Sequence, residues 1–232
     1  MKKTYKHIFF DLDHTLWDFE RNAEETKREM FGELKLKERG IESYELFREK
    51  YIGINQALWA LYRKDRVGKE ELNFRRFYDT LVLFGITDRS LGESMAKAFI
   101  EGITSKTYLF PFTRQLLDYL HPKYPLHIIT NGFEEVQYGK LKNSGLGAYF
   151  TKIITSEAAG SKKPDPDIFM YALKETGALA CESLMIGDDL EIDMAGARQI
   201  GMDQLFVNHE SIKHNEPVTL EVFALDQIMK LV

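Results

Sequence analysis

Five short apolar runs, each ending in polar or small residues, constrain the fold of this chain more than any other feature. The runs cover residues 8–10, 126–129, 153–154, 184–186 and 204–207, and the first strand is expected to extend over residues 6–11. Helical patterns separate the later runs, over residues 113–120, 134–144, 167–176 and 192–200. Strand–helix alternation is typical of a parallel sheet covered by helices. We therefore predict an α/β fold, with a Rossmann-like three-layer core around a mainly parallel sheet.

The segment between the first and second runs has a different pattern. Residues 22–103 contain no proline, and apolar side chains recur there at helical spacing, as at Phe47, Tyr51 and Leu58. Asn22 is predicted to cap the first helix, and Ser90 with Glu93 forms a predicted capping box for the last. We expect a helical cap domain over residues 17–104, inserted into a core made of residues 1–16 and 105–232.

Composition excludes several classes of protein. Of 232 residues, 44% are hydrophobic and 29% are charged, which is the balance of a folded globular chain. The net charge of −5 argues against nucleic acid polymers and anionic membranes as partners. The single cysteine, Cys181, cannot form an internal disulfide, and no apolar stretch approaches the length of a membrane span. We expect a cytoplasmic protein that is a monomer or a weak homodimer.

Polar side chains that could act in catalysis or metal binding follow four of the predicted strands. Because ligands of parallel α/β sheets bind at the carboxyl ends of the strands, we expect these side chains to converge. They are Asp11 and Asp13, then Thr130, Asn131 and Gly132, then Lys163, and finally Asp188, Asp189 and Asp193. Each motif alone is common in turns and helix caps, but their conjunction at four strand ends indicates a site.

The chemistry of this set points to phosphate. Clustered carboxylates raise one another's pKa unless a cation offsets them, and oxygen ligands suit Mg²⁺. No group of histidines and cysteines has the spacing of a zinc site. A carboxylate nucleophile beside Mg²⁺ suits phosphoryl transfer through an aspartyl-phosphate, in which Thr130, Lys163 and the amides of Asn131 and Gly132 donate hydrogen bonds to the phosphoryl group.

Residues 9–16 (FFDLDHTL), 128–132 (IITNG), 163–166 (KPDP) and 186–193 resemble the four motifs of the haloacid dehalogenase (HAD) superfamily, and the helical insert resembles its C1 cap. His14 stands where that family commonly has glycine. The resemblance implies that Asp11 is the nucleophile and Asp13 the general acid and base. It also implies that Thr130 and Lys163 hold the phosphoryl group, and that Asp11, the Asp13 carbonyl and Asp188 bind Mg²⁺. Asp189 and Asp193 are both candidates for the second acid of the fourth motif.

Within the superfamily, residues 13–19, 129–133 and 163–169 resemble the YjjG-type 5′-nucleotidase branch. This resemblance implies a small phosphorylated substrate, namely a nucleoside 5′-monophosphate. Trp17 and Arg76 are predicted to contact its leaving group. Asp13 favours phosphate ester hydrolysis over carbon–halogen cleavage, because an alkoxide leaving group needs a proton and a halide does not.

Other activities stay open at this point. On the same fold they are a pyrophosphatase, a sugar phosphatase, a phosphomutase or a 2-haloacid dehalogenase. From another class, a non-catalytic phospho-accepting switch also places Asp, Thr and Lys at strand ends.

Overall fold

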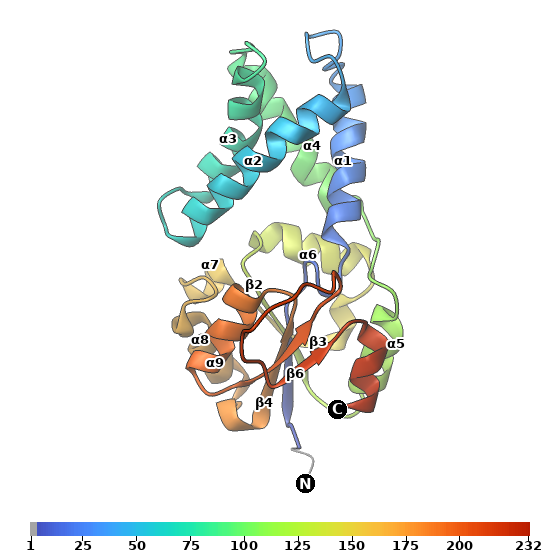
Figure 1. The fold of residues 1–232 in the computed structure, drawn as a ribbon, viewed down its shortest axis with the longest axis vertical. Helices are drawn as coiled ribbons and strands as arrows, with labels where there is room; N and C mark the ends of the chain where they lie inside the picture. The colour runs from blue at the N-terminus through green and yellow to red at the C-terminus, as the bar shows by residue number, and fades with distance from the viewer. Residues whose placement is uncertain (1–3) are drawn as a thin grey trace. The chain divides into compact units, whose positions relative to one another are not determined.

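The computed structural model describes residues 4–232 and contains a six-stranded sheet in which every neighbouring pair of strands is parallel (Figure 1). The strand order is β3-β2-β1-β4-β5-β6. The strands are β1 (His7–Phe10), β2 (Leu126–Thr130), β3 (Phe150–Thr155), β4 (Ser183–Gly187), β5 (Asp203–Val207) and β6 (Leu220–Val222). The predicted α/β class and parallel sheet are confirmed, and β6 at the sheet edge is an addition to the five predicted strands.

Helices cover both faces of this sheet (Figure 1). They are α5 (Thr113–Leu120), α6 (Glu134–Asn143), α7 (Ser156–Ala159), α8 (Pro166–Thr176) and α9 (Ala195–Gln199), with a 3₁₀ segment at Leu225–Lys230. Helices α8 and α9 pack on side chains of the central strands, such as Phe9, Ile129 and Met185. Strands buried on both faces read as continuous apolar runs, which explains the pattern in the sequence.

The helix predicted over residues 192–200 begins earlier and is less regular. A wide helical turn occupies Leu190–Met194, and α9 follows it. The turn starts at residue 190 because the Asp189 side chain accepts hydrogen bonds from the backbone N–H groups of Glu191 and Ile192.

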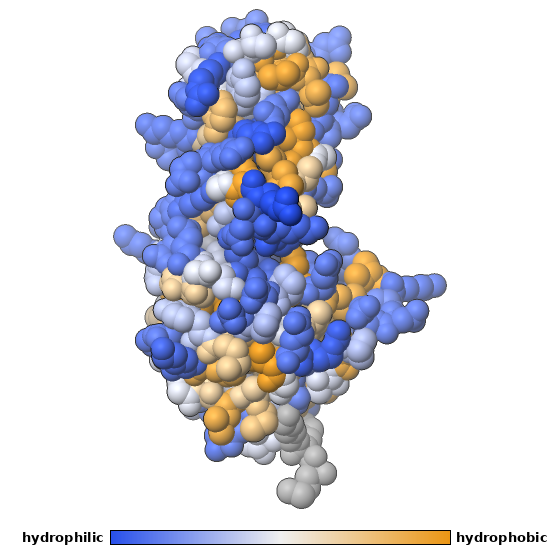
Figure 2. All heavy atoms as spheres, turned by 90° about the vertical axis from the view of Figure 1, so that its left-hand side faces the viewer, coloured by the Kyte–Doolittle hydropathy of each residue, from blue (hydrophilic) through white to orange (hydrophobic). Residues whose placement is uncertain are grey.

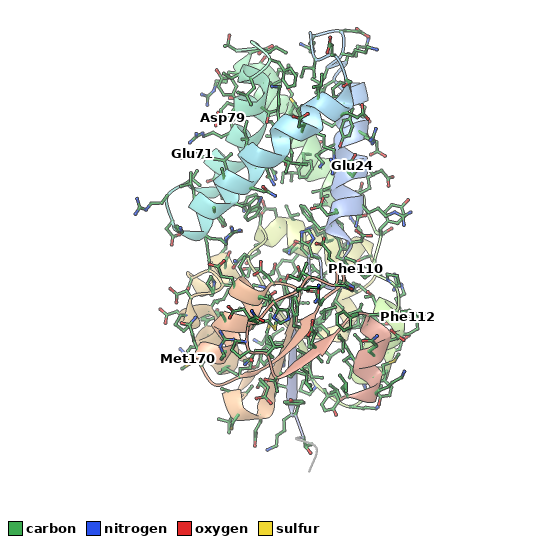
Figure 3. The ribbon with its side chains drawn as sticks, in the orientation of Figure 1. Glu24, Glu71, Asp79, Phe110, Phe112 and Met170 are labelled. Carbon is green, nitrogen blue, oxygen red and sulfur yellow. The ribbon has the colours of Figure 1, made fainter. Side chains whose placement is uncertain are left out.

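A second compact unit spans residues 21–106, while the preceding residues and residues 107–232 form the first. The second unit consists of four helices, namely α1 (Phe19–Glu33), α2 (Tyr44–Arg63), α3 (Lys69–Val82) and α4 (Arg89–Ser105). Helix α1 begins just before the start of this unit. Its core is aromatic, with Tyr51 stacked on Phe77 at a centroid distance of 5.2 Å and Phe99 5.5 Å from Phe77. On its surface, Arg75 pairs with Glu71 and Asp79, one turn away on either side along α3 (Figure 3).

Two capping predictions in this unit are wrong. Asn22 lies inside α1, which starts at Phe19, and its carbonyl accepts a hydrogen bond from the Thr26 hydroxyl. Helix α4 is capped by Asp88 and not by Ser90, because the Asp88 carboxylate accepts from Leu91 N at 3.1 Å and also from the Ser90 hydroxyl. An ionised carboxylate is the stronger acceptor of the two, so it takes the capping position.

The surface is of an ordinary kind for a folded chain. On the face drawn in Figure 2, hydrophilic and hydrophobic residues are intermixed. Large apolar side chains such as Met170 and Leu179 are more than half exposed, which is common for isolated residues. Among the described residues, every helix is too short or too polar to cross a lipid bilayer.

A histidine pair links the neighbouring strands β1 and β2, and one member of the pair is buried. The ring nitrogens His7 Nδ1 and His127 Nε2 lie 3.1 Å apart, and His127 is 1% exposed. Burial, followed by the charges of His7 and Lys152, lowers the pKa of His127 to about 4. His127 is therefore neutral in the folded protein at pH 5, where the unfolded chain would protonate it.

We expect His127→Gln to weaken the loss of stability on acidification. Because the folded pKa is below the unfolded value near 6.5, stability is lost as the pH falls from about 6.5 towards 4, by about 1–2 kcal/mol at pH 5. Urea unfolding at pH 7.5 and pH 5 measures this difference. His121→Gln, at an exposed site, serves as the control, and an equal loss in wild type and His127→Gln would contradict the prediction.

Candidate active site

The first motif follows β1 and joins the end of β4. Asp11 N donates to the Ile186 carbonyl at 2.9 Å, and the Thr15 hydroxyl donates to Asp188 Oδ1 at 2.9 Å. His14 adopts a left-handed conformation with φ of 62°, which is the backbone that glycine adopts most easily. The turn thus places the carboxylates of Asp11 and Asp188 at neighbouring strand ends.

A single buried lysine links two of the acids. Lys163 Nζ donates to Asp11 Oδ1 and to Asp193 Oδ1, both at 2.7 Å, and its side chain is 2% exposed. The Asn131 side chain fixes the lysine backbone, because Oδ1 accepts from Lys163 N and Nδ2 donates to the Lys163 carbonyl, each at 2.8 Å. The motif after β2 therefore positions the lysine of the next motif.

Three carboxylates lie close together near this one lysine, so negative charge is in excess there. Oxygens of Asp11, Asp188 and Asp193 lie within 4.8 Å of one another. Burial foremost, together with the neighbouring acids, raises the pKa of Asp11 to about 7, and it also raises the pKa values of Asp188 and Asp193. The two carboxylates around Lys163 outweigh its burial and raise its pKa. Oxygen donors with excess negative charge fit a divalent cation such as Mg²⁺.

The structure separates Asp193 from Asp189. Asp193 is buried and contacts Lys163 through Oδ1, while its Oδ2 accepts from the Asp189 backbone N–H at 3.2 Å. The Asp189 side chain instead caps the turn that follows it. Gly187 makes room for this arrangement, since a Cβ there would lie 2.4 Å from Asp193 Oδ2.

Asp13 faces helix α6, which the sequence reasoning did not connect with the site. Lys140 Nζ donates to both oxygens of Asp13, at 2.7 and 2.9 Å, and Gln137 Nε2 donates to Asp13 Oδ2 at 3.0 Å. Gln137 and Lys140 are three residues apart and so share one face of α6. That spacing was the available signal, but no apolar stripe on α6 marks which face is buried.

The Thr130 hydroxyl lies beside the same glutamine. It accepts hydrogen bonds from Gln137 Nε2 at 2.7 Å and from Gly132 N at 3.1 Å. A hydroxyl has two acceptor sites and one hydrogen, so these two bonds direct its hydrogen elsewhere. A Cβ on Gly132 would lie 2.5 Å from the Gln137 amide, which explains glycine at this position.

The two residues predicted to contact the leaving group have structural surroundings of their own. The Trp17 side chain is fully buried, and Lys140 Nζ lies 4.4 Å from its ring centroid. Arg76 is buried, and its guanidinium lies 4.6 Å from the Phe99 ring centroid and bonds Asn73 within the helical unit. Their contact with a leaving group stays a prediction.

A cavity of about 310 Å³ opens beside Asp188 in the α/β unit. Its lining includes His14, Asp18, Phe110 and His209. Phe110, labelled in Figure 3, stacks on His209 with ring centroids 3.9 Å apart. The carboxylate cluster is therefore next to a space large enough for a small molecule.

A family model described as a haloacid dehalogenase-like hydrolase matches residues 5–201. The chain belongs to this family. The resemblance seen in the four motifs is thereby confirmed, and the chain is a hydrolase.

Named relatives extend over nearly the whole chain. Pyrimidine 5′-nucleotidase PynA of Streptococcus pneumoniae is 29% identical over 229 residues, 97% of this chain and 94% of the relative. Pyrimidine 5′-nucleotidase YjjG of Escherichia coli is 29% identical, covering 97% of this chain and 96% of the relative. The crystal structure of the putative HAD-hydrolase YfnB of Bacillus subtilis, bound to magnesium, has a TM-score of 0.88 at 26% identity and covers 99% of both chains.

Proposed function

We propose that this chain is a Mg²⁺-dependent phosphatase that hydrolyses small phosphate monoesters through a phosphorylated Asp11. The observation that carries the proposal is the contact of buried Lys163 with both Asp11 and Asp193, beside Asp188. Such a lysine and a bound cation offset the charge of the acids, so that a phosphate dianion can approach a carboxylate. The carboxylates of Asp11 and Asp188 and the carbonyl of Asp13 would hold the ion.

Two displacements complete the reaction. In the first, an Asp11 oxygen bonds to phosphorus while the ester P–O bond breaks, and the Asp13 carboxyl gives its proton to the leaving oxygen. In the second, a water oxygen bonds to phosphorus while the Asp11–phosphorus bond breaks, and the Asp13 carboxylate takes the proton of that water. Phosphate leaves, and both aspartates return to their first state.

The remaining residues of the site hold the transferred group. The hydrogen of the Thr130 hydroxyl is directed away from its two donors, Gln137 and Gly132, and can bond a phosphoryl oxygen. Lys163 supplies the counter-charge, and Asp193 holds the lysine in place. These roles need no large motion within the α/β unit, because all of the groups already lie at one sheet edge.

For the substrate, we propose a nucleoside 5′-monophosphate. The supporting observation is the similarity over nearly the full chain to two pyrimidine 5′-nucleotidases. The test is initial rates with UMP, dUMP, glyceraldehyde 3-phosphate, hexose phosphates, pyrophosphate and a 2-haloacid, each with and without Mg²⁺. Highest kcat/KM for a pyrimidine monophosphate supports the proposal. Preference for a sugar phosphate overturns the substrate only, while release of halide alone overturns the phosphatase.

Removal of Mg²⁺ is expected to abolish turnover and lower the thermal stability. At a Mg²⁺ concentration 100 times its Kd, binding adds about 2.7 kcal/mol to the stability of the folded state. The raised pKa values of Asp11, Asp188 and Asp193 mean that protons compete for the site, so the stabilisation should grow between pH 5 and pH 8. Melting curves with EDTA and with Mg²⁺ measure it.

Two variants control this measurement. Asp188→Asn should lose the Mg²⁺-dependent rise in Tm. Asp189→Asn should retain it, since Asp189 caps the following turn and asparagine caps a helix equally well. An unchanged Tm in wild type on adding Mg²⁺, at every pH, would refute the metal site.

A further inference from the structure

Side chains of helix α6 donate three hydrogen bonds to the carboxylate of Asp13, the second acid of the first motif. Lys140 Nζ contacts both oxygens of Asp13, and Gln137 Nε2 contacts one of them. Because a carboxylate only accepts hydrogen bonds, the nitrogen of the Gln137 amide is the atom that faces it. The donor side chains are buried while the Asp13 side chain is 20% exposed, so the acid is the outermost member of the group.

The two donors are themselves fixed. Lys140 Nζ lies over the Trp17 ring at 4.4 Å and near the Phe19 ring at 5.2 Å, and its side chain is 3% exposed. Gln137 is fully buried and also donates to Thr130 Oγ1 at 2.7 Å. A lysine with this little space has few rotamers, so it holds its partner in one orientation. The glutamine links the acid to the hydroxyl proposed to bind the phosphoryl group.

We propose that Lys140 and Gln137 are positioning residues that hold the Asp13 carboxyl in line with the leaving oxygen, in register with the phosphoryl group on Thr130. This role rests on the proposed phosphatase reaction. Lys140 acts through Asp13 and does not touch the substrate. Proton transfer depends steeply on the placement of the donor, and a misplacement of about 1 Å can cost on the order of 100-fold in rate.

The leaving group provides the test. A phosphate ester of an aliphatic alcohol or of phenol needs a proton on its leaving oxygen, whereas 2,4-dinitrophenolate leaves without one. We expect Lys140→Met to lower kcat/KM, which reports the first displacement only, by about 30- to 100-fold for phenyl phosphate and by less than about threefold for 2,4-dinitrophenyl phosphate. Lys140→Arg, which keeps a charged donor, should recover most of the loss.

Controls separate this role from a structural one. The ratio of kcat/KM for the two esters in one sample does not depend on how much of the protein is folded, so partial unfolding leaves the readout valid. Lys142→Met changes an exposed lysine on the same helix and should keep the wild-type ratio. The double variant Asp13→Asn, Lys140→Met should be no slower than Asp13→Asn alone, because both changes remove one function.

Each outcome has one meaning. Equal losses of kcat/KM for both esters in Lys140→Met, or additive losses of kcat/KM in the double variant, overturn the positioning role. If Asp13→Asn itself shows no dependence on the leaving group, the acid role assigned to Asp13 fails. If Asp11→Asn keeps full activity, the proposed phosphatase mechanism fails as a whole. The inference and the function it rests on can therefore fail separately.

Discussion

Replacing Asp11 by asparagine should lower kcat with any phosphate monoester by at least about 10⁴-fold, because the amide cannot form the phosphorylated intermediate. The fold should survive the change. Asparagine has the shape of aspartate, and the negative charge that it removes is one that burial and Asp193 already disfavour, as the raised pKa of Asp11 shows. The loss of rate should therefore come without a loss of structure.

The same change should raise the thermal stability of the metal-free protein. Asp11, Asp188 and Asp193 outnumber Lys163 by three to one, and removing one acid relieves part of this repulsion. Circular dichroism melting in EDTA measures the effect, and rates with p-nitrophenyl phosphate in Mg²⁺ measure the activity. Activity within tenfold of wild type would refute Asp11 as the nucleophile, whatever the melting curve shows.

Replacing Lys163 by methionine should be the most destabilising of the changes considered for this site. Removing one partner of a buried ion pair costs about 3–5 kcal/mol, and Lys163 is the shared partner of Asp11 and Asp193. Methionine keeps the volume and the flexible stem, so a packing defect contributes little. Urea unfolding of the metal-free protein at pH 8 measures the loss.

The pH dependence of that loss identifies its cause. Acids whose folded pKa is raised bind protons more tightly when folded, so their cost appears as the pH rises from about 4 through the folded pKa, which is about 7 for Asp11. The destabilisation by Lys163→Met should therefore be smaller at pH 5 than at pH 8. Lys174→Met, at an exposed position on α8, should be neutral at both. A loss independent of pH would point to packing and away from charge.

The strand ends were predictable from the sequence because buried apolar residues are followed there directly by polar residues of the site. Phe10 ends a buried run and Asp11 follows it, and Ile129 with Thr130 shows the same pattern. In a parallel sheet such residues must meet at one edge. The order of the motifs along the chain then predicted both the fold class and the family.

Helix α6 was not predictable in the same way. Its sequence, EEVQYGKLKN, presents polar residues around most of its circumference, so nothing marks Gln137 and Lys140 as buried. Both become buried because Asp13 and Thr130, brought from two strands, supply partners for their polar ends. Long-range hydrogen bonding decides such positions, and a local pattern does not contain it. The cap predictions for α1 and α4 were wrong for local reasons. Helix α1 starts before Asn22, and the carboxylate of Asp88 takes the capping position of α4.

The place of β1 in the sheet also has a consequence for synthesis of the protein. Ile8 pairs with Leu126 on one side and Leu184 on the other, and both partners are made long after it. The central strand therefore waits for most of the chain to leave the ribosome, while helices α1–α4 have their partners much sooner. Asp11 and Asp13 spend that interval beside an unpaired apolar strand, and their charges help to keep it in solution until its neighbours arrive.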